Sequence, residues 1–284
     1  MKIDLNMVRK LVKRHLHTTI DDDAYKILKK YEAQFGNLNT VLKKALQSFD
    51  QSHHKTKVGL KSFKFTTTRI KTGDAGIDEL LEGGIPEGFV VVVTGKPGTG
   101  KTTLALQFLV AGTNNNERGI YFSFEENAEQ LAKHCLRFGW NIQKLIEDGL
   151  LELFGFTVLD FEDIAEIIDD YKPKRAVFDS MNVLIDPDEF RRSVTWRNLL
   201  KVLKRNQVVS LMLTEKKSGL DNLVFDEFDF MADGIFLLDR ETRRQGDRYL
   251  LSIQKMRTTD INSVPRPFRF TKNGITLFPD EPVL

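Results

Sequence analysis

The stretch that decides the fold reads Phe89-Val-Val-Val-Val-Thr-Gly95-Lys-Pro-Gly-Thr-Gly-Lys101-Thr102. Its second half matches G-x-x-x-x-G-K-[ST], the pattern of a loop whose backbone N–H groups wrap a phosphate chain. An apolar run precedes the loop, and Thr103-Leu-Ala-Leu-Gln-Phe-Leu-Val110 continues it as a helix. A phosphate-binding loop requires this strand–loop–helix order. The stretch therefore predicts a nucleoside-triphosphate site in an α/β domain.

The residue types in the loop follow from the chemistry of that ligand. Glycines let backbone amides approach the phosphates, and the start of the helix adds positive potential. Lys101 supplies a point charge between the β and γ phosphates, and Thr102 offers a hydroxyl to Mg²⁺. We expect ATP with Mg²⁺ to bind the loop residues Gly95, Lys96, Pro97, Gly98, Thr99, Gly100, Lys101, Thr102 and Thr103.

Acidic residues at strand ends complete the expected site. Asp179 follows the apolar run Arg175-Ala-Val-Phe and would hold the magnesium shell together with Thr102. Glu125 and Glu126 follow the next strand after the loop helix, where a carboxylate orients the attacking water. We favour Glu125 as the base, with Glu126 assisting. A second reading stays open at this point, in which both acids merely cap the following helix.

Apolar segments alternate with amphipathic ones after the loop, which predicts a mostly parallel sheet covered by helices on both faces. The last three expected strands are separated only by loops and predict an antiparallel edge. The expected strands are 89–94, 119–124, 151–156, 175–179, 208–214, 234–239, 249–255 and 268–271.

Charge divides the chain. Residues 1–64 carry 14 Lys/Arg and 6 Asp/Glu, although the whole chain is only +2. We expect a basic module at 1–50, a linker at 51–66 and the nucleotide-binding domain at 67–284.

The single cysteine, Cys135, shares an apolar helical face and cannot form an internal disulfide, so we expect a cytoplasmic protein. The longest apolar run is too short to span a membrane, so we expect no membrane partner.

Several segments together resemble the KaiC/RadA branch of RecA-like ATPases, particularly the single-domain KaiC-like proteins common in archaea. The similarity covers about residues 69–279. It is carried by the glycine-rich loop and by 72–88, Phe124-Glu-Glu126, 138–150, Asp179-Ser180, Leu213-Thr-Glu215 and Lys255-Met-Arg257.

This resemblance implies a RecA-like twisted sheet, ATP hydrolysis, a catalytic role for both Glu125 and Glu126, and assembly into a ring, normally a hexamer. It also implies that Lys255 and Arg257 lie on an edge strand and reach the γ-phosphate bound by the neighbouring subunit. Thr214 would sense that phosphate.

Two departures from the family pattern have consequences. Thr258-Thr259-Asp260 replaces the usual residues after Lys-x-Arg, which alters the expected contact between subunits. Asp229 and Phe230 align with the Ser–Thr pair that is phosphorylated in the circadian clock relative. We therefore expect no autophosphorylation there, and the single ATPase domain argues against a clock oscillator.

The front module, with its order of strand, helix, glycine turn and helix, resembles ribbon-helix-helix DNA-binding modules. In such modules two strands pair in a dimer and enter the major groove. The corresponding double-stranded DNA contacts would be made by His15, His17, Thr19, Asn37 and Asn39.

Two functions remain open from the sequence. One is a ring ATPase associated with DNA through residues 1–50. The other is a nucleotide-dependent signalling or assembly switch that docks on a protein partner, in which the front module is a helical docking or oligomerisation element.

Overall fold

The computed structural model describes Lys30 and residues 68–155, 161–183, 194–216, 227–244 and 246–278. The chain separates into two compact units, Met1–Phe65 and Thr66–Leu284. The elements expected in the front module lie outside the described residues, so that module and its boundaries stay a prediction. The same holds for the residues expected to contact DNA: His15, His17, Thr19, Asn37 and Asn39.

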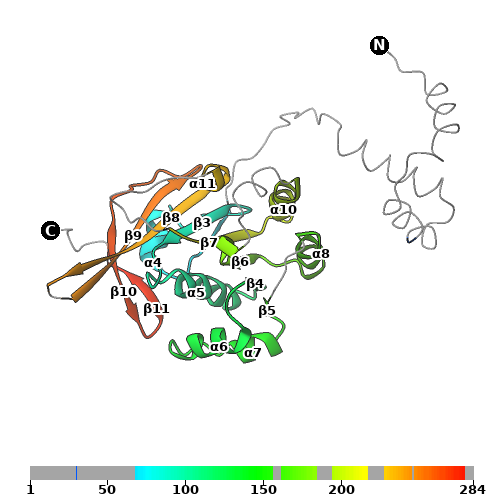
Figure 1. Cartoon of the computed structure of the whole chain (residues 1–284), viewed down its shortest axis with the longest axis horizontal. Helices are drawn as coiled ribbons and strands as arrows, with labels where there is room; N and C mark the ends of the chain where they lie inside the picture. Colours follow the sequence, from blue (N-terminus) through cyan, green and yellow to red (C-terminus); the bar gives the residue numbers. More distant parts are fainter. Residues whose placement is uncertain are drawn as a thin grey trace, which may run out of the picture. The chain divides into compact units, whose positions relative to one another are not determined.

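A nine-stranded sheet organises the described part of the second unit (Figure 1). Its order is β11-β10-β9-β8-β3-β7-β6-β4-β5. The strands from β8 to β5 run parallel, whereas β9, β10 and β11 are antiparallel to their neighbours. The bounds are β3 Val90–Gly95, β4 Gly119–Ser123, β5 Leu151–Gly155, β6 Arg175–Asp179, β7 Val209–Glu215, β8 Gly234–Arg243, β9 Gly246–Met256, β10 Arg266–Thr271 and β11 Gly274–Leu277.

This sheet confirms the expected α/β fold with an antiparallel C-terminal edge, and it corrects one detail. The strand beginning at Gly234 was expected to belong to the antiparallel group, but its first half pairs in parallel with β3. Its second half extends further as one arm of a hairpin with β9. The antiparallel edge therefore consists of β9, β10 and the short β11, which was not expected. Neither was the small two-stranded sheet of β1 (Arg69–Ile70) and β2 (Ile85–Pro86).

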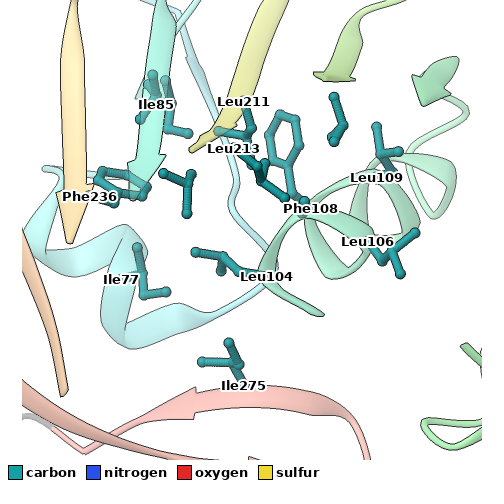
Figure 2. Packing of buried hydrophobic residues seen from close by; sticks show 14 of the residues in the cluster. Ile77, Ile85, Leu104, Leu106, Phe108, Leu109, Leu211, Leu213, Phe236 and Ile275 are labelled. Carbon is teal, nitrogen blue, oxygen red and sulfur yellow. The ribbon is translucent and has the colours of Figure 1, made fainter. Parts of the chain in front are cut away.

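Helices cover both faces of the sheet, which explains the unbroken apolar run in β3. Val91 and Val93 pack in one buried cluster, which α5 enters with Leu104 and Phe108 (Figure 2). Val90 and Val92 belong to the opposite cluster, shared with α8 and α10. A strand buried on both faces needs apolar residues at consecutive positions. The helices are α4 Ala75–Leu80, α5 Lys101–Thr113, α6 Ala128–Leu136, α7 Ile142–Glu147, α8 Phe161–Tyr171, α10 Val194–Arg205 and α11 Glu227–Met231, with a 3₁₀ turn η1 at Met181–Val183.

A buried charge anchors the amino end of β6. Arg175 is 0% exposed, and its Nη2 lies 2.6 Å from Oε2 of Glu117. Its Nη1 donates to the carbonyl oxygens of Lys71 and Phe108 at 2.6 and 2.7 Å. Buried guanidinium groups require this degree of pairing, because an unpaired charge in the interior is costly. The contacts fix the strand that carries Asp179 at its other end.

Candidate active site

The loop after β3 has a backbone that only glycine tolerates at two positions. Gly95 has φ 155°, and a Cβ there would come within 2.1 Å of the carbonyl oxygen of Leu238. Gly100 has φ 99° in the left-handed region, and a Cβ there would come within 2.8 Å of the Phe270 ring. Gly100 is also the N-cap of α5, and its lack of a side chain leaves the first amides of the helix uncapped by any side chain. Such amides and the helix dipole favour a bound anion.

Lys101 lies across this loop. Its Nζ donates to the carbonyl oxygens of Gly95 and Lys96, at 3.1 Å in both cases. Oε1 of Glu215, at the end of β7, is 3.5 Å from the same nitrogen. Glu215 is itself held by Asn182, whose side chain exchanges two hydrogen bonds with its backbone at 2.6 and 3.1 Å. The ammonium group therefore has polar partners already, in a place where phosphate oxygens can replace them.

Asp179 and Thr102 are brought together as the sequence predicted. Thr102 Oγ1 donates to Oδ2 of Asp179 at 3.0 Å, and Tyr121 OH donates to the same oxygen at 2.5 Å. Burial raises the pKa of Asp179, while these two hydrogen bonds act in the opposite direction. Burial and the neighbouring Asp179 raise the pKa of Tyr121 well above its usual value, so its hydroxyl stays a donor.

The side-chain oxygens of Asp179 and Thr102 are suitable ligands for Mg²⁺. A carboxylate and a hydroxyl are hard oxygen ligands, and Mg²⁺ in phosphate sites typically takes one or two protein ligands along with phosphate oxygens and water. Within the described residues, no group of three or more His, Cys, Asp or Glu side chains is arranged to hold a metal. The residues present therefore suit a magnesium ion that arrives with its nucleotide, and they do not form an all-protein metal cage.

Glu125 and Glu126 follow β4 in a turn and both line the pocket described below. Ser123 Oγ accepts from the backbone N–H of Glu126 at 3.1 Å and donates to its carbonyl, which fixes the turn. The helix that follows is capped by Asn127, which forms a reciprocal pair of hydrogen bonds with Gln130. The capping part of the alternative for the two acids is therefore wrong, because Asn127 caps the helix, although both acids are exposed to solvent.

A pocket of about 430 Å³ connects these groups. Its wall contains many of the predicted residues, namely Gly98, Gly100, Lys101, Thr102, Thr103, Glu125, Glu126 and Asp179. Sequence reasoning did not assign the other lining residues to the site, although Ser180 and Glu215 belong to segments that carry the resemblance. These residues are His134, Arg137, Ser180, Glu215, Tyr249 and Phe270.

Two of the unpredicted groups come from distant parts of the chain. The rings of Tyr249 and Phe270 meet edge to face, with centroids 4.9 Å apart, and form an aromatic wall. His134 Nε2 lies 2.9 Å from Thr103 Oγ1, and burial lowers the pKa of this histidine. No local sequence signal marks these residues, because they reach the pocket through strand order and helix packing.

Some predicted loop and strand residues lie beside the pocket without lining it. Thr99 Oγ1 donates to the carbonyl of Lys96 at 2.8 Å and stabilises the loop. Thr214 is 6% exposed, and its neighbour in the parallel register is Thr94. The Oγ1 atoms of Thr94 and Thr214 have no hydrogen-bond partner within the described structure. Gly95, Lys96 and Pro97 shape the loop, and they too lie outside the pocket lining.

Lys255 and Arg257 lie away from this subunit's own pocket. Lys255 Nζ donates to the carbonyls of Asp229 and Phe230 at 3.2 and 3.0 Å, and Arg257 Nη1 lies 2.7 Å from Oδ1 of Asp233. Lys255 lies in β9, which ends one residue before Arg257. This strand is not the edge strand expected from the resemblance, because β10 lies beyond it in the sheet. However, β10 pairs with β9 only at positions 249–251, so the Lys255 end of β9 is bordered by β8 alone.

Comparisons with known proteins give a consistent result for the second unit. A family model described as "ATPase: KaiC" matches residues 70–282. A UPF0273 protein of Pyrococcus furiosus is 33% identical over 235 residues, which cover 75% of this chain and 95% of that protein. The crystal structure of a KaiC-like protein from Pyrococcus horikoshii is 30% identical with a TM-score of 0.62, covering 75% of this chain and 100% of that one.

The circadian clock oscillator protein KaiC 1 of Synechocystis is also similar, at 31% identity over 230 residues. That match covers 74% of this chain but 44% of the clock protein.

In the described part of the chain, no helix is long and apolar enough to cross a membrane.

Proposed function

Because the chain belongs to the KaiC family of ATPases, we propose that it binds ATP with Mg²⁺ and hydrolyses it to ADP and phosphate. The observation that carries this proposal is the convergence of Lys101, Thr102, Asp179 and the pair Glu125–Glu126 on one pocket at the carboxyl ends of the parallel strands. Ligands of α/β sheets bind at this edge.

The chemistry of each group supports hydrolysis. The amides of the loop and Lys101 bind the β and γ phosphates, while Thr102 and Asp179 hold the magnesium ion, which neutralises phosphate charge when bound. Glu125 accepts a proton from a water molecule whose oxygen attacks the γ phosphorus as the bond to the β–γ bridging oxygen breaks. Glu126 assists by orienting that water. The aromatic wall of Tyr249 and Phe270 suits a stacked base.

Self-association completes the site in this proposal. KaiC-like ATPases usually oligomerise, and Lys255 and Arg257 lie outside their own subunit's pocket. In a closed ring of identical subunits, most simply a hexamer, they contact the γ-phosphate of the neighbour. Cations supplied this way stabilise charge that develops during phosphoryl transfer.

Catalysis is tested by two substitutions and one matched control. Lys101→Ala should lower the ATPase rate by at least about a hundredfold, as loss of a transition-state charge contact does. Glu125→Gln should lower it by about a hundredfold or more, as loss of a general base does. Glu129→Gln removes an exposed carboxylate that pairs with Lys133 on α6, outside the pocket, and should change nothing. Unchanged turnover in the Lys101 or Glu125 variant contradicts the proposal.

For residues 1–50 we propose binding to double-stranded DNA, on the basis of the basic excess in this segment. Phosphate contacts release counterions, so affinity for a duplex should fall steeply with salt and disappear when 1–50 are deleted. The alternative is a nucleotide-dependent switch that docks on a protein partner. Tight ATP binding with very slow turnover and no affinity for duplex supports that alternative.

A further inference from the structure

The short helix α11 holds Lys255, and Asp233, just after that helix, holds Arg257. Lys255 Nζ donates to the carbonyl oxygens of Asp229 and Phe230, at 3.2 and 3.0 Å. Arg257 donates to the carboxylate of Asp233 at 2.7 Å and, through its backbone N–H, to the carbonyl of the same residue at 2.9 Å. Carbonyl groups at the C-terminal end of a helix favour a cation. The position of the Lys255 side chain therefore depends on where α11 lies.

An ion pair ties α11 to the subunit's own phosphate loop. The carboxylate of Asp229 pairs with Lys216, and both side chains are largely buried, at 2% and 11% exposure. Lys216 directly follows β7, and its backbone N–H donates to the carbonyl of Gly95 at 3.3 Å. The residue before it, Glu215, contacts the Nζ of Lys101. A continuous chain of polar contacts thus runs from Lys101 to Lys255.

The segment that follows α11 is anchored independently of the phosphate loop. Asp233 is 3% exposed, accepts from the backbone N–H of Val90 at 3.2 Å and pairs with Lys204 of α10 at 3.1 Å. This end of the segment is therefore fixed to the start of β3, at the end of that strand opposite the phosphate loop. Among the contacts of the described residues, the Lys216–Asp229 pair is one through which an event at the phosphate loop can reach the segment.

We infer that the Lys216–Asp229 ion pair positions Lys255 for its contact with the neighbouring subunit. Through this pair, the position of Lys255 depends on the state of the nucleotide site in its own subunit. The inference rests on the proposed function, since it requires ATP hydrolysis and Lys255 acting in trans. A phosphate bound at Lys101 competes with Glu215 for the ammonium group, and movement of Glu215 carries Lys216 and α11 with it. Asp229 and Lys216 lie outside the lining of the pocket, so both are positioning residues.

The test removes the tie without leaving a buried charge alone. Breaking such a pair on one side is strongly destabilising, whereas replacing both partners with apolar groups is often tolerated. We therefore choose the double variant Lys216→Met/Asp229→Leu, with Lys174→Met/Glu87→Leu as a control. The control removes another partly buried ion pair, which lies just before β3 and β6 at the amino ends of these strands, whereas the pocket lies at their carboxyl ends. Lys216→Arg, which keeps the pair, is a conservative second variant.

The expected result is a lower kcat, which subunits with an intact Lys216–Asp229 pair restore in mixed oligomers. The Lys216/Asp229 double variant should lose about tenfold to a hundredfold in kcat, since misplacement of a reacting group by about 1 Å has effects of this size. KM for ATP should stay near the wild-type value, because its own pocket is intact. The control pair and Lys216→Arg should retain the wild-type rate.

Mixed oligomers separate positioning from damage. When differently tagged double-variant and Glu125→Gln subunits are co-expressed and purified on both tags, the double-variant sites next to a Glu125→Gln subunit receive an intact Lys255. For random equal mixing in a ring, activity should recover to about a quarter of the wild-type rate. With Glu125→Gln/Lys255→Ala as the partner, recovery should be absent.

The outcomes distinguish the inference from the function on which it rests. A double variant with the wild-type rate, or a loss that the Glu125→Gln partner does not restore, overturns the inference alone. A wild-type chain without ATPase activity refutes the proposed function. A normal rate for Lys255→Ala refutes the contact between subunits.

Discussion

Removing one hydroxyl tests how the magnesium ligand is held. In Tyr121→Phe, Asp179 Oδ2 keeps Thr102 as a donor but loses the hydroxyl that lies 2.5 Å away. Tyr121 is 0% exposed, so water does not easily replace the lost donor. A hydrogen bond to a charged acceptor contributes about 1.5–3 kcal/mol and one between neutral groups about 0.5–1.5 kcal/mol. We expect the free energy of unfolding at neutral pH to fall by about 1.5–3 kcal/mol.

The pH dependence of this loss has a definite sign. Burial raises the pKa of Asp179 above 3.8 in the folded protein, and the Tyr121 hydrogen bond opposes that rise. Its removal raises the pKa of Asp179 further. Protonation of the carboxyl group relieves the cost of burying its charge, so the difference between wild type and variant is largest above the pKa of Asp179. As the pH falls through that pKa, the difference should shrink toward the neutral value of about 0.5–1.5 kcal/mol.

Urea unfolding at several pH values, without nucleotide and with a chelator present, measures the loss. Tyr171→Phe is the matched control, because its hydroxyl donates to the backbone carbonyl of Gly149 at 3.2 Å at an exposed position. That variant should lose less than about 1 kcal/mol, independently of pH between 5 and 8. If Tyr121→Phe behaves like Tyr171→Phe, or if its loss does not change with pH, the hydrogen bond to an ionised Asp179 is not what stabilises this site.

Three further predictions follow from other contacts. Glu117→Ala leaves Arg175 buried without its carboxylate and should lower the free energy of unfolding by about 3–5 kcal/mol in denaturant titrations; retained stability contradicts the pairing. Asn127→Ala removes the cap of α6 and should cost about 1 kcal/mol, a loss that Asn127→Asp should not show. Burial raises the pKa of the Cys135 thiol to about 12, so this cysteine should not react with a disulfide reagent at pH 8 until urea unfolds the chain.

Local pattern sufficed for much of the site. The loop glycines, Lys101 and Thr102 lie in one continuous segment, and the strand and helix on either side leave few alternatives for their geometry. Asp179 could be predicted from the sequence because strands of a parallel sheet present their carboxyl ends at one edge. The alternation of apolar strands and amphipathic helices likewise predicted the sheet and its antiparallel end.

Local pattern also left a choice that the structure narrows by excluding one role. The sequence did not separate a catalytic position for Glu125 and Glu126 from a capping role, because either fits an acidic pair between a strand and a helix. The cap that Asn127 provides removes the second possibility.

Other groups became visible only with the strand order. Tyr121 looks like one more apolar position in a strand, and its hydroxyl finds Asp179 because β4 pairs with β6. The aromatic wall joins residues from β9 and β10, which follow the phosphate loop by well over a hundred positions.

The sequence by itself thus determined the chemistry of the phosphate loop and the class of the sheet, since both depend on residue type and short-range spacing. Tertiary structure alone decided which distant side chains close the pocket, and that Lys255 contacts α11 and Arg257 contacts Asp233, both outside the lining of their own pocket. The physical reason is that hydrogen-bonded pairing sets the order of the strands, and the spacing of residues along one strand does not specify which other strand becomes its neighbour.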